Sequence, residues 1–255
     1  MRDLSRWGRP ALEAMAAAGD EILECCRVLA KSGDTVVSEA LRGTPGFYAW
    51  NHYPPGDVYD AVTHAQYFYH AHPESERTAR EHGHFHTFLR PRGMPPGARP
   101  LMMPELAIAD APAAPAGPAV PQPDQGADND ELSHLIAIAM DTDGEPIRLF
   151  TTNRWVTGEA WYAADDVVPM LDRFVIDLAR PSWPLNRWIT AMFRLFRPQM
   201  AELIGARDEA VMSWRRRHRG KVHVFEDRRL EIASAVDIDV AEHIRRVNLA
   251  LRQVA

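Results

Sequence analysis

The chain has 255 residues, 46% of them hydrophobic, with a formal net charge of -6 and a pI near 6.0. This length and composition can bury a substantial core, so we expect one domain over residues 1–255. The acidic balance argues against a protein devoted to nucleic acid, and with no run of 18 apolar residues we expect no membrane partner either.

The cysteines and the N-terminus indicate the cell compartment. Cys25 and Cys26 are the only cysteines, and adjacent residues of a helix point about 100° apart. We therefore expect neither a regular disulfide nor a thiolate zinc cluster, which favours a reducing compartment. Residues Met1 to Trp7 contain an acidic residue and no apolar core, unlike a signal peptide. The predicted localisation is cytoplasmic.

The first third of the chain is predicted to contain two helices and a strand. Apolar residues recur at helical spacing from about Pro10 to Lys31. After a turn-rich segment, Asp57 is suited to cap a second helix that runs to about His72, where Pro73 marks a break. Alternating residues then predict a strand from Glu81 to Leu89.

The middle of the chain is rich in proline. Ten of the twenty prolines lie between Pro91 and Pro123, and alanine, glycine and aspartate fill much of the remainder. Such a composition cannot bury enough apolar area to fold. The sequence therefore predicts a flexible Pro/Ala-rich insertion at about 91–129.

The last part of the chain is predicted to alternate hairpins and helices. Two apolar runs joined through Asp143-Gly144 predict an antiparallel pair, and a basic run from Arg215 to Lys221 is typical of a helix C-terminus. These elements predict an α+β fold, in which a small antiparallel sheet carrying a His-rich strand packs against several amphipathic helices. The expected strands are 134–141, 147–152, 221–225 and 230–235, and the expected helices are 165–180, 183–207 with a kink at Pro198, and 239–253.

Histidine is the residue type with the most informative distribution. Eight of the eleven histidines fall between His52 and His134. In the predicted strand, His82, His84 and His86 occupy alternate positions, so an ideal strand presents all three on one face. Three imidazoles on one face favour a metal site.

The expected metal ligands are His84, His86 and His134. His84 and His86 supply two donors from one strand, and His134 opens the next strand, sharing its face with Ile136 and Ile138 under ideal alternation. The arrangement resembles the zinc site of the α-carbonic anhydrases, whose ligand strand matches His84-Phe85-His86. The resemblance covers about a dozen residues and concerns ligand geometry alone. A site of nitrogen and oxygen donors admits zinc, iron(II), manganese or copper, and of these divalent transition metals we expect zinc or iron.

Two residues are candidates for moving protons. Glu81 points away from His82 on an ideal strand, but it reaches the site if the chain bends at Gly83. His64 lies one helical turn after Asp60, a spacing that orients an imidazole. His70 and His72 lie about 200° apart on a helix, so both join the site only if the helix ends before them.

The expected function is that of a metalloenzyme acting on a small molecule, by hydrolysis or hydration with zinc and by oxidation with iron. Three alternatives remain open. The protein could bind or carry a metal without catalysis, or it could be an interaction module without metal, its histidines being structural. The histidines could also serve acid-base or haem chemistry.

Overall fold

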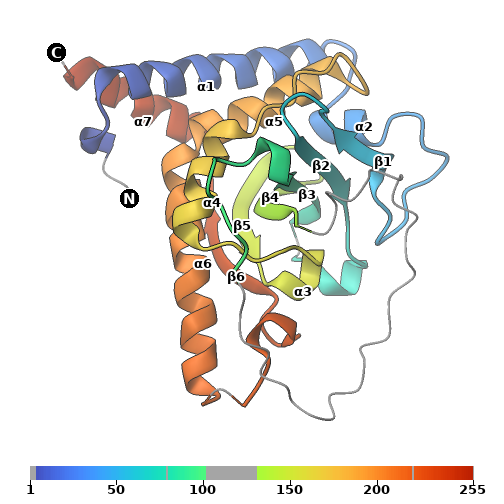
Figure 1. Ribbon diagram of the computed structural model, residues 1–255. Coiled ribbons are helices and arrows are strands. Elements are labelled where there is room, and N and C mark those ends of the chain that lie inside the picture. Colours follow the sequence, from blue (N-terminus) through green and yellow to red (C-terminus); the bar gives the residue numbers. More distant parts are fainter. Residues whose placement is uncertain (1–3, 79, 102–130, 220, 255) are drawn as a thin grey trace.

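One antiparallel sheet forms the centre of the molecule. The computed structural model describes residues 4–78, 80–101, 131–219 and 221–254. Within these residues, six strands are joined in chain order, each antiparallel to the next, as Figure 1 shows. The strands are β1 (Tyr53–Tyr59), β2 (Ala65–His70), β3 (Glu81–Leu89), β4 (Ser133–Asp141), β5 (Pro146–Thr152) and β6 (Ile232–Asp237).

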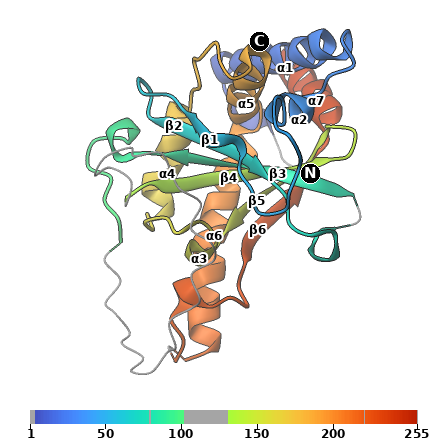
Figure 2. The same cartoon turned by 90° about the vertical axis from the view of Figure 1, so that its right-hand side faces the viewer.

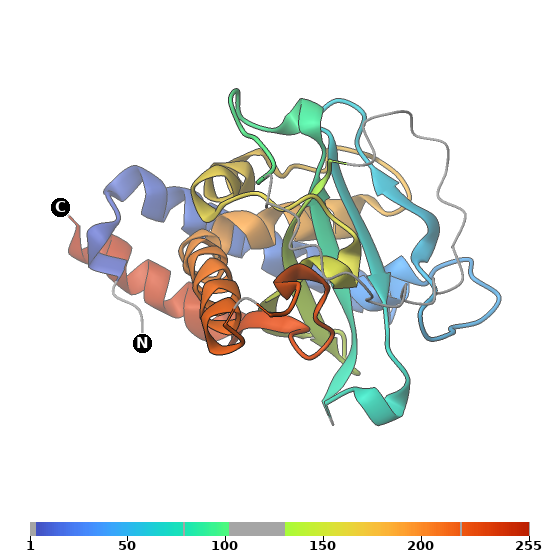
Figure 3. The same ribbon diagram turned by 60° about the horizontal axis from the view of Figure 1, so that its bottom comes forward.

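The long helices gather on one side of this sheet. Helix α1 (Arg9–Ala30) packs against α5 (Trp183–Leu195) and α7 (Val240–Gln253), and α6 (Arg197–Arg217) packs against β5 and β6. Figure 3 shows α1, α6 and α7 on one side and β1 and β2 at the far side, and Figure 2 shows α1, α5 and α7 together. The shorter helices are α2 (Val36–Ala40), α3 (Arg154–Thr157) and α4 (Ala164–Met170).

Helix α5 covers one face of the sheet, so the two faces can be distinguished by their position relative to this helix. The Trp188 ring lies 5.7 Å from the Phe85 ring of β3, and the Tyr67 hydroxyl of β2 donates a 2.6 Å hydrogen bond to Asn186 Oδ1. All four side chains are buried. Because neighbouring residues of a strand face opposite ways, His84 and His86 lie on the face away from α5.

The predicted α+β class and the predicted bounds of the His-rich strand are confirmed, since β3 spans Glu81–Leu89. The predicted helix from Asp57 to His72 is wrong, because this stretch forms the hairpin of β1 and β2. Every residue of β2 is buried, so both faces of this strand are covered, and its aromatic run has a high β-propensity. Asp60 closes the hairpin, with Oδ1 accepting from the Val62 and Thr63 amides.

The C-terminal elements differ from the prediction mainly in their ends. The helix expected over 165–180 ends at Met170. The helix expected over 183–207 is two helices, α5 and α6. Helix α6 begins one residue before Pro198, so this proline lies in the first turn of the helix. No strand forms at 221–225, where Val224–Glu226 is a short 3-10 helix. The basic run does lie at the C-terminal end of α6, which closes at Arg217.

Three further expectations concern the proline-rich insertion, the cysteines and the membrane. Of the predicted insertion at 91–129, residues 102–130 lie outside the described residues, and Pro91–Gly93 forms a 3-10 turn. Cys25 and Cys26 are free thiols in α1. Among the residues that the structure describes, no helix is long and apolar enough to cross a membrane.

Candidate functional site

The face of the sheet away from α5 carries a layer of imidazoles. The ring of His84 lies 4.8 Å from that of His86 and 4.5 Å from that of His70. Further rings extend this layer across three strands and their loops, so that adjacent rings are in edge or stacking contact. The members are His52, His70, His72, His84, His86 and His134.

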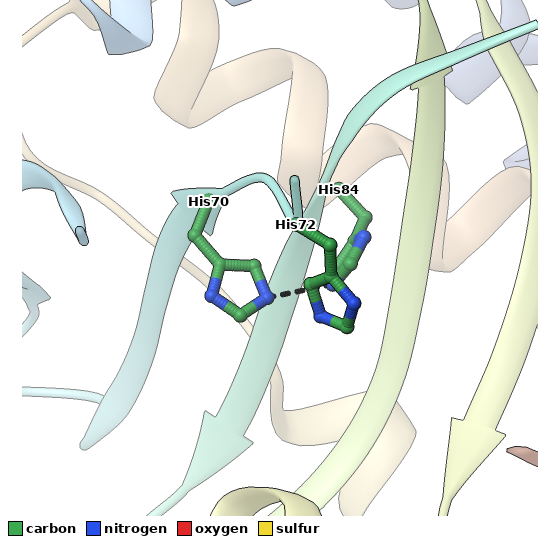
Figure 4. A group of neighbouring side chains, drawn as sticks. All are labelled: His70, His72 and His84. Atoms are coloured by element: carbon green, nitrogen blue, oxygen red, sulfur yellow. Dashed lines mark hydrogen bonds between the residues drawn. The ribbon is translucent and has the colours of Figure 1, made fainter. Parts of the chain in front are cut away.

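Three of these side chains converge as metal ligands do. His70, His72 and His84 each offer one nitrogen, and these atoms all lie within 4.8 Å of one another. Figure 4 shows the three imidazoles pointing toward one another from the end of β2, the following loop and β3. The Nε2 atoms of His70 and His84 are 2.7 Å apart. Imidazoles on one zinc ion hold their nitrogens about 3.4 Å apart, so small side-chain rotations suffice for binding.

The backbone explains why these residues meet. His70 is the last residue of β2 and pairs with His84 across the ladder, while His72 follows in an extended loop beside the exposed Trp50, whose ring lies 4.3 Å away. Gly83 permits this close approach, because a Cβ at that position would lie 2.5 Å from the His70 carbonyl oxygen. Two strands can therefore bring their histidines together only with glycine here.

Glu81 orients the central ligand. Its Oε1 lies 2.8 Å from His84 Nδ1, so the ring donates its Nδ1 proton to the carboxylate and keeps the Nε2 lone pair directed at His70. The ladder shifts register between Glu81 and Gly83, which is the bend on which the predicted reach of Glu81 depended. A carboxylate behind a ligating imidazole fixes its tautomer and raises its basicity.

The same irregularity moves His82 to the other face. His82 Nδ1 lies 2.7 Å from the Tyr69 hydroxyl, and its ring stacks on Phe47 at 4.9 Å. The expectation that all three alternate histidines share one face is therefore wrong for His82, because the bulge breaks strict alternation.

His86 and His134 form a separate pair. His86 Nδ1 lies 3.0 Å from His134 Nε2, and His134 Nδ1 lies 3.4 Å from Thr152 Oγ1. His134 does not share a face with Ile136 and Ile138, because a second register shift in the β3–β4 ladder turns it toward the imidazole layer. The buried Glu159 accepts a 2.6 Å hydrogen bond from the His134 backbone amide.

The structure thus divides the predicted ligand set His84, His86 and His134. It brings His86 to His134, but places His84 with His70 and His72 as the one convergent group of three ligands among the described residues. His64 lies elsewhere. It follows the β1–β2 turn, its Nδ1 is 2.6 Å from the Tyr59 hydroxyl, and six residue positions, about 20 Å of extended strand, separate it from His70.

Burial favours the neutral form of four imidazoles in this layer. Desolvation lowers the pKa of His72 to about 4 and that of His134 to about 3. The pKa values of His70 and His86 also fall well below the usual value, first through burial and then through neighbouring imidazoles. A neutral imidazole presents the lone pair that a metal needs, so these ligands are in the binding form at neutral pH.

Two small cavities border the layer. One of about 80 Å³ is lined by His72, His84 and His86 together with polar and apolar residues of β5 and the loops, and one of about 100 Å³ is lined by His52, His70 and His86. Val156 of α3 borders both. The histidines are therefore accessible to a ligand of a few heavy atoms.

His70 and His72 are the ligands that sequence reasoning underrated. In a helix they point apart, whereas in extended chain residues two apart share a side. The signal that could have found them is the aromatic run Tyr67-Phe68-Tyr69, which is typical of a strand and not of a helix.

Comparison with known proteins supplies a family but no activity. Neither a search of curated proteins nor a search of solved structures finds a similar chain. The model of one family, described as "Domain of unknown function (DUF6969)", matches residues 16–238, which include the whole imidazole layer and all six strands. The chain belongs to this family, the domain of unknown function DUF6969.

Proposed function

We propose that this protein is an enzyme that depends on one divalent transition metal, held by His70, His72 and His84, and that acts on a small molecule. The observation that carries the proposal is the convergence of three imidazole nitrogens within 4.8 Å of one another. Three protein ligands leave a coordination position free, which is the pattern of catalytic and not of closed structural sites.

Zinc and iron are the metals we propose, because both bind imidazole nitrogen well. When bound, zinc would supply a Lewis acid for hydrolysis or hydration, and iron would supply redox chemistry for an oxidation. The free thiols of Cys25 and Cys26 support a reducing compartment, for which we propose the cytoplasm.

The chain's own residues prepare the site in three ways. Burial keeps the pKa of His70 and His72 below the usual value, so protons do not compete for their nitrogens at neutral pH. Glu81 holds the Nδ1 proton of His84 and thereby aims Nε2. The cavity of about 80 Å³ beside His72 and His84 admits a small ligand and limits water.

A second candidate is a metal-handling protein without catalysis. The observation that favours it is the His86–His134 pair, whose nitrogens lie 3.0 Å apart directly beside the first group. A protein that buffers a metal ion gains from additional donors of this kind, since they provide further sites of lower affinity.

Elemental analysis tests the first proposal. Untagged protein is purified without chelator or added metal, and the wild type is compared with His70→Ala, His72→Ala and His84→Ala. We expect about one equivalent of zinc or iron in the wild type and its loss in each variant. His64→Ala is the matched control, because His64 contacts Tyr59 far from the group, and should keep the metal.

Three outcomes would count against this assignment. Metal that persists in the three variants but is lost in His86→Ala and His134→Ala would move the site to the second pair. Several equivalents bound weakly and reversibly would favour the metal-handling protein. An absence of metal in every sample, even after anaerobic loading with iron, would return the histidines to a structural role.

A further inference from the structure

Arg77 stands beside the histidine group without an adequate partner. It lies in the loop between β2 and β3, and its side chain is only 15% exposed. One terminal nitrogen, NH1, donates a 2.6 Å hydrogen bond to the His82 carbonyl. Arg77 lines the same cavity as His72 and His84.

The other edge of this guanidinium makes only one long ion pair. Arg77 Nε is buried and has no hydrogen-bond partner, while NH2 lies 3.8 Å from Glu74, a side chain that is 94% exposed. An ion pair at that distance with a solvated carboxylate contributes little. An unpartnered buried donor costs free energy, and Nε with NH2 forms the planar fork that binds the two oxygens of a carboxylate.

Arg77 borders the same cavity as two of the proposed metal ligands. Arg77, His72 and His84 all line the space of about 80 Å³, whose other walls include the apolar side chains of Phe150 and Val156. Three neutral imidazoles leave a divalent ion its full charge, of which Glu81 offsets one unit. The remaining carboxylates of the lining belong to Glu76 and Glu231, which are both exposed to solvent.

We propose that this cavity binds a small organic carboxylate, whose two oxygens are held by the Nε and NH2 edge of Arg77 while its other end faces the metal. The apolar walls suit the carbon atoms of an organic acid better than an inorganic oxyanion. The inference rests on the proposed metal site for the second end of the ligand, but the Arg77 contact does not require a metal. Arg77 is thus a residue that determines specificity for acids.

Cobalt(II)-loaded protein provides the test, because cobalt absorption reports a ligand that enters its coordination sphere. Succinate is titrated as the probe into the wild type, Arg77→Gln and Arg77→Lys. We expect the dissociation constant to rise roughly 10- to 100-fold in Arg77→Gln, as loss of a bidentate charged contact implies. Arg77→Lys keeps the charge without the fork and should lie between. Arg80→Gln is the matched control, since Arg80 is 76% exposed and three residues away.

The metal content and thermal unfolding of each variant distinguish a loss of the Arg77 contact from a loss of the metal site or of the fold. Arg77→Gln that keeps cobalt and folds normally but binds succinate weakly supports the inference. Equal affinity in the wild type and Arg77→Gln, no binding of succinate to cobalt-loaded wild type, or tighter binding of inorganic phosphate than of succinate would overturn it.

If the wild type binds no metal, the proposed function fails and calorimetry with metal-free protein decides the Arg77 contact alone. Succinate binding that depends on Arg77 then supports a carboxylate site, and its absence rejects one.

Discussion

At the scale of single residues, the site is built from pairs in which one side chain directs another. Glu81 contacts the Nδ1 atom of His84 and Thr152 the Nδ1 atom of His134, and in each pair the other nitrogen points to a second imidazole. An ionised carboxylate only accepts hydrogen bonds, so Glu81 fixes the tautomer of His84, whereas the Thr152 hydroxyl can donate to His134 or accept from it. A substitution of Glu81 should therefore be the most informative test of how these contacts affect metal binding.

We predict that Glu81→Gln weakens metal binding without removing it. The amide is nearly isosteric but loses the negative charge that raises the basicity of His84, so affinity should fall roughly 10- to 100-fold. Competition with a chromogenic chelator measures this change. Glu76→Gln, at an exposed position of the same cavity, should leave the affinity unaltered, and a similar loss in both variants would contradict the orienting role.

The second prediction concerns the buried Glu159. Burial raises its pKa to about 8, although Arg207 and the His134 amide lower it in part. Between the usual pKa of a glutamate and 8, the native state holds a proton that the unfolded state releases, so this group makes stability fall as pH rises through that range. Below the usual value both states are protonated and the effect vanishes.

Glu159→Gln should remove this dependence. Urea unfolding near pH 5 should give similar free energies for both proteins, whereas near pH 9 the variant should be more stable by roughly 3 to 5 kcal/mol. Parallel pH profiles for the two proteins would show that Glu159 is ionised in the native state.

At the scale of elements, the approach of β2 and β3 creates the ligand group. The ladder places His70 opposite His84, and the bulge at Gly83 lets Glu81 reach the same ring. A Cβ on Gly83 would lie 2.5 Å from the His70 carbonyl and 2.7 Å from the Tyr69 hydroxyl oxygen. The backbone atom cannot move aside as a flexible side chain can.

We therefore predict that Gly83→Ala lowers the free energy of unfolding by roughly 1 to 3 kcal/mol and weakens metal binding, because β3 must shift away from His70. Chemical denaturation and metal titration check the two effects. Gly205→Ala serves as the control, since a Cβ there meets nothing within 4 Å and a helical alanine is favoured. It should be as stable as the wild type or more so.

At the scale of the whole molecule, the site joins segments that are distant in sequence. β2, β3, β5 and α3 all contribute to the two cavities, while α5 and the helices packed on it support the opposite face of the sheet. A metal that bridges the end of β2, the following loop and β3 binds only the folded chain, so binding must raise global stability.

We predict that zinc at 100 times its dissociation constant stabilises the protein by about 2.7 kcal/mol, which corresponds to a rise of roughly 5 to 10 °C in Tm for a chain of this size. Differential scanning calorimetry with and without zinc measures the shift. His72→Ala should abolish the shift at little cost in stability, because His72 is only half-buried. An equal shift in that variant would argue that zinc binds elsewhere.

Local patterns were sufficient for much of the fold. Apolar periodicity located α1, alternation located β3 to the residue, and Asp143-Gly144 located the hairpin of β4 and β5. In each case the signal lies within about ten residues of chain and depends on the period of one element. The expectation that a bend at Gly83 brings Glu81 to the site also depended only on neighbouring residues.

The hairpin of β1 and β2 could not be recognised from alternation, because β2 is buried on both faces and no alternating pattern remains to identify it. The faces taken by His82 and His134 depend on register shifts in the β3–β4 ladder, which are properties of a strand pair and not of either strand. A register error of one residue turns a side chain to the opposite face of the sheet, so such errors have their largest effect on the predicted set of metal ligands.

The sequence by itself determined the fold class, the strand with the histidines and the concentration of imidazole from His52 to His134. Only the tertiary structure decided which of these histidines form one group, because convergence depends on strand pairing, bulges and the absent Cβ of Gly83. Residue type determines which chemistry is available, whereas distances of a few ångströms between separate strands determine which histidine nitrogens can bind one metal ion. That physical difference explains why His70 and His72 emerged only with the fold.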